Sequence, residues 1–174
     1  GELAESWAIS DDGLTMTFHL RRDVRWHDGK PFTSADVLFT YLMFIDPETP
    51  TAYAESYRQV TTAAAPDPYT FVLTYAKPYA PAPGSWGVAI HPKHLLDGLK
   101  GADLAKSPLT RSPIGTGSFR FKSWVPGEKL VLEANDDYFE GRPYLNRVVY
   151  RIIPDLSTQF LELLSGGLDF MGLT

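Results

Sequence analysis

Large apolar residues occupy every second position over residues 14–20, and polar residues fill the positions between them. A period of two predicts a half-buried β-strand. Asp11-Asp12-Gly13 stands directly before it, and Asp-Gly favours a tight hairpin because glycine adopts positive φ at little cost. A short strand over residues 6–10, with the same alternation, is therefore expected to pair with it.

A capped helix is predicted at about residues 34–45. Thr33 and Asp36 have the spacing of a capping box, in which each side chain bonds the backbone of the other residue. The positions that follow have helical spacing and predict an apolar stripe. The stripe consists of Val37, Leu38, Tyr41, Leu42 and Ile45.

The rest of the chain mixes strand and helix patterns, so the fold class is α+β. Strands are expected at 57–65, 69–75, 86–90, 118–124, 129–134, 147–153 and 168–171, and helices at 92–99 and 157–164. Three prolines argue against regular structure over residues 77–84. The polar, Pro- and Gly-rich residues 107–117 form the best internal boundary.

Composition excludes several classes of function. The net charge is −5 and no Lys/Arg cluster forms a basic stripe, so nucleic acid is not an expected partner. The chain has no cysteine, which excludes disulfides, thiolate metal sites and cysteine nucleophiles. No apolar run has the length of a membrane span.

No catalytic or metal-binding constellation is evident, and we expect no cofactor. His91 and His94 lie three residues apart without a third ligand at matching spacing, so a surface pair is expected. His27-Asp28 resembles a dyad, but neighbouring strand residues point to opposite faces. Asp136-Asp137 follows a strand and more often caps a turn. The sequence therefore favours a binding protein over an enzyme such as a hydrolase.

Residues 4–37, AESWAISDDGLTMTFHLRRDVRWHDGKPFTSADV, resemble the bacterial extracellular solute-binding proteins of family 5, the periplasmic receptors for oligopeptides, dipeptides and nickel of ABC importers. Further segments follow in the order of the family. They are Asp46-Pro47-Glu48-Thr49, Pro113-Ile114-Gly115-Thr116-Gly117, Asn135-Asp136-Asp137-Tyr138-Phe139, Gly141-Arg142-Pro143, Ile153-Pro154-Asp155 and 164–170. The resemblance thus covers essentially the whole chain.

The resemblance implies a periplasmic-binding-protein-like fold of class II with two lobes. Residues 1–112 would be the subdomain inserted in lobe I, residues 113–174 the incomplete beginning of main lobe I, and lobe II would be absent. Because the first residues already belong to a folding unit and no leader precedes them, we expect the chain to be a fragment.

The function that the resemblance implies is capture of a peptide or another small solute and delivery to the membrane subunits of an ABC permease. The protein would lie in the periplasm or outside the cell and associate with the membrane through the transporter. A lipid anchor, if present, would lie outside this fragment. The alternative is a ligand-sensing effector domain of a cytoplasmic regulator, because similar domains also occur fused to DNA-binding regions.

Four residues are expected to contact ligand. Tyr53 matches a tyrosine that projects into the cleft in peptide-binding relatives, although a loop tyrosine also packs locally. Trp86 lies where nickel-binding relatives place ligand-contacting residues, but core packing explains it better. Thr116 and Gly117 belong to a loop that returns to the main lobe near the cleft, and glycine permits close approach of a backbone. A plain crossover between domains explains this loop equally well.

Overall fold

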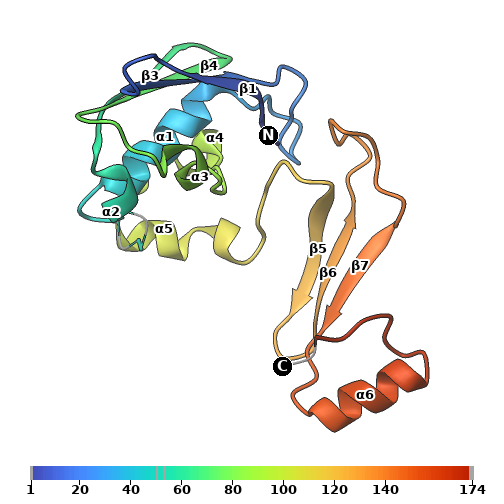
Figure 1. The fold of residues 1–174 in the computed structure, drawn as a ribbon. Coiled ribbons are helices and arrows are strands. Elements are labelled where there is room, and N and C mark those ends of the chain that lie inside the picture. The colour runs from blue at the N-terminus through green and yellow to red at the C-terminus, as the bar shows by residue number, and fades with distance from the viewer. Residues whose placement is uncertain (1, 50, 53, 173–174) are drawn as a thin grey trace.

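The computed structural model describes residues 2–49, 51–52 and 54–172, and it contains two separate antiparallel sheets (Figure 1). The first sheet has the order β1 (Ala4–Ile9), β2 (Thr15–Leu20), β4 (Thr70–Tyr75), β3 (Val60–Asp67). The second has the order β5 (Phe119–Val125), β6 (Lys129–Ala134), β7 (Arg147–Arg151). Helices α1 (Ser34–Ile45) and α6 (Leu156–Leu164) accompany the first and the second sheet, respectively. The mixed architecture confirms the α+β class.

The first hairpin forms as its sequence predicts. Gly13 has a φ of 69°, which a tight turn requires here. Strand β2 pairs with β1 on one side and β4 on the other, so it is a central strand. Its alternation buries Met16 and Leu20, which pack with Phe71 and Leu73 of β4 in the core.

Helix α1 packs on this sheet, but the predicted apolar stripe is partly wrong. Val37 and Tyr41 are buried as expected, whereas Leu42 is 51% exposed. Phe44 and Thr40 occupy the buried face instead. The hydroxyl of Thr40 donates to the Asp36 carbonyl at 2.9 Å, so a polar residue is buried without losing its hydrogen bond.

The predicted capping box is confirmed, and the Asp36 side chain also links α1 to a second helix, α4 (Lys93–Leu96). Its Oδ2 accepts from the Thr33 N–H at 2.9 Å, and its Oδ1 accepts from the Lys93 N–H at 3.0 Å, where α4 begins. Asp36 is only 5% exposed. It therefore satisfies two backbone donors away from solvent.

Replacing this side chain, Asp36→Ala, is expected to lower the free energy of unfolding by about 2–4 kcal/mol, because two N–H groups lose their acceptor. Urea unfolding of the chain measures the change. The control Asp97→Ala removes an exposed carboxylate whose ion pair with Lys93 is 3.9 Å long, and it should cost less than about 0.5 kcal/mol. Equal stability of the two variants would contradict the linking role of Asp36.

Residues 77–106 differ most from expectation. The strand expected at 86–90 is wrong, because these residues pair with no strand in the described part of the chain. Helix α3 (Ala82–Ser85) precedes them, so the expectation of no regular structure over 77–84 is wrong at its end. Pro81 and Pro83 lie at the start of this helical turn, where a missing N–H costs little. Helix α4, which follows, is shorter than expected. The remaining short helices are α2 (Ala54–Tyr57), α5 (Ala102–Lys106) and η1 (Pro108–Thr110).

The second sheet and α6 have little core of their own. Strands β5, β6 and β7 and α6 lie close to their predicted positions, and Asp155 caps α6 by accepting from the Thr158 N–H at 2.7 Å. The strand expected at 168–171 is wrong, since those residues form none. Many large apolar side chains here are solvent-exposed. They are Tyr144, Leu145, Val149, Tyr150, Ile152, Leu156, Phe160, Leu161, Leu164 and Phe170.

Arg21 connects the two parts of the structure. Its guanidinium lies 5.0 Å from the centre of the Phe139 ring and donates to Glu140 Oε1 at 3.3 Å.

In the described part of the chain, no helix has both the length and the apolar character needed to cross a membrane. The assignment of residues 1–112 and 113–174 to a subdomain and a main lobe stays a prediction.

Candidate functional site

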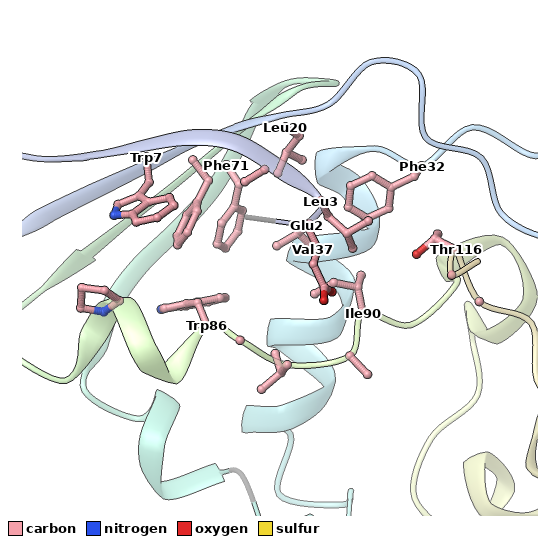
Figure 2. Close-up of a pocket in the computed structure, with 18 residues that line it drawn as sticks. Glu2, Leu3, Trp7, Leu20, Phe32, Val37, Phe71, Trp86, Ile90 and Thr116 are labelled. Carbon is pink, nitrogen blue, oxygen red and sulfur yellow. The ribbon is translucent and has the colours of Figure 1, made fainter. Parts of the chain in front are cut away.

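A cavity of about 680 Å³ lies between the core face of the first sheet and the irregular segment 86–90 (Figure 2). Trp7, Phe71 and Leu20 of the sheet form one wall, and Trp86 and Ile90 lie opposite. Among the described residues that line it, only Glu2 carries a charge. An apolar, aromatic-lined hollow with few polar groups is typical of sites for small ligands.

The structure brings three of the four expected site residues to this cavity. Trp86, Thr116 and Gly117 all line it, although they come from segments 30 residues apart in the chain. A Cβ built at Gly117 would meet no heavy atom within 4 Å, so the space beside that backbone is open. Tyr53, the fourth, lies outside the described residues.

Trp86 packs against the core and also lines the cavity. Its ring centre lies 5.0 Å from that of Tyr57 and 5.2 Å from that of Phe71, and its indole N–H donates to the Tyr75 hydroxyl at 3.1 Å. These contacts fix the orientation of the indole, so the face that it presents to the cavity is preorganised. Core packing and cavity lining are therefore compatible at this position.

Sequence reasoning missed Trp7, which is 50% exposed on the edge strand β1. It pairs with Phe18 across the hairpin, so both side chains lie on the sheet face that lines the cavity. The alternation of β1 placed Trp7 on a face with Ile9. It gave no sign that this part of the face is left open. Its exposure on an edge strand becomes visible only in the structure.

The loop at residues 115–117 lies at one end of the cavity and is held by His27. The His27 N–H donates to the Gly115 carbonyl at 2.9 Å, and the Gly115 N–H donates to His27 Nδ1 at 3.2 Å. Because Nδ1 accepts, the proton of the neutral ring is on Nε2, which donates to the Gly117 carbonyl at 3.0 Å. Burial lowers the pKa of His27, which favours this neutral form.

The other candidate histidines have separate partners. His94 Nε2 contacts Asp28 Oδ2 at 2.7 Å, and the ring of His91 stands edge-on to Phe44, with its pKa lowered by burial. No group of three potential metal-ligating side chains occurs among the described residues. The geometry therefore offers an apolar binding surface with a fixed loop at one end.

The profile of the family described as bacterial extracellular solute-binding proteins, family 5 Middle, matches residues 1–174. The chain belongs to this family. Family members are solute-binding proteins, which agrees with the resemblance found in the sequence.

Individual relatives support the same classification. The oligopeptide-binding protein AppA of Bacillus subtilis is 37% identical over 98% of this chain and 32% of its own length. Its structure in complex with a nonapeptide superimposes with a TM-score of 0.87, at 35% identity over 95% of this chain and 34% of that one. NikZ of Campylobacter jejuni, in complex with Ni(L-His), gives a TM-score of 0.88 at 32% identity, over 95% of this chain and 33% of that one.

Ligand chemistry varies among these relatives. Heme-binding protein A of Haemophilus influenzae is 31% identical over 97% of this chain and 34% of its own length. The chain spans about a third of the length of the relatives that it matches. The fold is that of class II periplasmic binding proteins, as the sequence predicted.

Proposed function

We propose that this chain is part of the substrate-binding component of an ABC importer that captures a peptide or a similar small solute. The observation that carries the proposal is the apolar, aromatic-lined cavity in a chain of the solute-binding family 5. Residues 1–112 would be the inserted subdomain of lobe I and residues 113–174 the start of its main part. The regulator alternative finds no support among the relatives described above.

A peptide fits the chemistry of the cavity best. Trp7 and Trp86 offer flat apolar surface to side chains of varied shape, whereas Thr116 and Glu2 offer a hydroxyl and a carboxylate. A carboxylate suits an ammonium group, such as a peptide N-terminus. Tyr53 is proposed to add a further ring to this surface. No group here is proposed to act in catalysis.

Transport would follow from closure of two lobes. A ligand that contacts both lobes favours the closed form by its differential affinity for that form. The closed receptor would then dock on the membrane permease, from the periplasm or the cell exterior. This chain would supply one wall of the cleft.

The proposal is tested in the whole receptor with the variant Trp7→Ala and its matched control Ile9→Ala. Both residues are about half exposed and lie two positions apart on β1, but Ile9 does not line this cavity. An equimolar pool of pentapeptides is titrated and bound masses are read by native mass spectrometry. Trp7→Ala should weaken pool binding about tenfold or more, because it removes a large apolar contact, whereas Ile9→Ala should change it less than about threefold.

Absence of any bound peptide in the wild-type receptor would contradict the proposal that the solute is a peptide. Equal binding by both variants and the wild type would instead show that this cavity is not part of the binding surface. A single sharp mass retained from the host would point to a dedicated small solute.

A further inference from the structure

Two residues far from the 115–117 loop in the sequence hold its backbone. His27 makes three hydrogen bonds to it, to the carbonyl and N–H of Gly115 and to the carbonyl of Gly117. Asn135, which is 6% exposed, donates from Nδ2 to the same Gly117 carbonyl at 3.0 Å. Both lone-pair directions of that carbonyl are thus used, and its orientation is fixed.

The residue between the two held glycines is Thr116. It lines the cavity and makes no hydrogen bond to any other described residue. Figure 2 shows its side chain at one end of the cavity, on the side of Phe32 and away from Trp7 and Trp86. Its hydroxyl is therefore free to bond a ligand, in a position that the two flanking contacts determine.

We propose that His27 is a positioning residue that holds the 115–117 loop so that Thr116 presents its hydroxyl to the bound solute. This inference rests on the proposed function, since it assigns a role within that binding site. The role requires the tautomer with hydrogen on Nε2: protonation of Nδ1 would set an N–H against the N–H of Gly115 and break that bond.

The surroundings of the ring oppose such protonation. Burial lowers the pKa of His27 and the charge of Arg120, on β5, lowers it further, whereas the Gly117 carbonyl and Asp28 raise it. Asp28 is itself engaged by His94. Because the folded-state pKa of His27 lies below the ordinary value of about 6.5, the ring stays neutral at and above that value. The loop contact is lost only as the pH falls further, through the lowered pKa.

The test compares three variants in the whole receptor by titrating the pentapeptide pool at several pH values. His27→Gln keeps a donor for the Gly117 carbonyl but does not titrate, His27→Phe keeps only the ring, and His19→Phe alters an exposed histidine on β2 as the control. We expect His27→Phe to weaken binding about tenfold and His27→Gln less than about threefold. Wild-type affinity should fall as the pH is lowered through the depressed pKa of His27, and the His27→Gln receptor should lack this fall.

Equal losses in His27→Gln and His27→Phe, or a wild-type pH profile that His27→Gln retains, would overturn the proposal. If the His27→Phe receptor does not fold, the pH profiles of the wild-type and His27→Gln receptors are sufficient to test the proposal. Imidazole ¹⁵N resonances of the chain give a readout without ligand: His27 must show the neutral ring with hydrogen on Nε2. If that signature is present and no pool member binds, the proposed function fails while the loop contact stands.

Discussion

Replacing Phe71 by alanine should lower the free energy of unfolding of this chain by about 3–5 kcal/mol. Phe71 is fully buried in the central strand β4, opposite Phe18 of β2. Its ring centre lies 5.2 Å from that of Trp86 and 6.4 Å from that of Phe18. Truncation removes the apolar contacts of both rings and leaves a cavity that a close-packed sheet cannot fill by relaxing.

Chemical denaturation monitored by tryptophan fluorescence measures this loss. The matched control is Tyr144→Ala, which removes an aromatic ring that is fully exposed to solvent, and it should change stability by less than about 0.5 kcal/mol. Phe71→Leu should fall between the two. A cost of under about 1 kcal/mol for Phe71→Ala would mean that Phe71 is not part of a close-packed core.

Backbone amides in β5, β6, β7 and α6 should exchange with deuterium at least about a hundredfold faster than those in β2 and β4. Most side chains of the second sheet and α6 are exposed or half-buried, and among described residues 118–172 only Ala134 and Asn135 are buried. Local opening of this part therefore loses little buried apolar surface. Opening of β2 or β4 exposes the main core.

Hydrogen exchange read by mass spectrometry on the chain by itself gives the comparison peptide by peptide. In the whole receptor, further chain is expected to cover the exposed faces, so the difference should shrink there. Similar protection of both sheets in the isolated chain would show that the second sheet is stabilised by contacts other than apolar burial.

Local patterns predicted most of the fold. The alternation of β2 and β4, the Asp-Gly turn and the Thr33/Asp36 cap depend on neighbours in the sequence, and all are confirmed. The strand expected at 86–90 failed because an apolar run forms a strand only when another strand offers an edge. The fold brings no such edge to Trp86, whose indole packs among core aromatics instead.

The candidate site could be predicted less well. Trp86, Thr116 and Gly117 were selected through the family resemblance, and their common position around one cavity depends on tertiary packing. Trp7 was missed because alternation shows which face a side chain shares, but not which part of that face stays uncovered. His27 was considered only as half of a dyad with Asp28, and its contact with Gly115 joins residues 88 positions apart.

Trp86 packs against the core and also lines the cavity, and this affects how a receptor of this kind can evolve to bind new solutes. A substitution there would disturb Tyr57, Phe71 and the bond to Tyr75 together, so selection for folding would resist it whatever the solute. A substitution of Trp7 would disturb fewer core contacts, since half of its surface already faces solvent on an edge strand. Evolution toward new solutes is therefore expected to proceed through the β1 wall of the cavity, while the Trp86 wall is inherited unchanged.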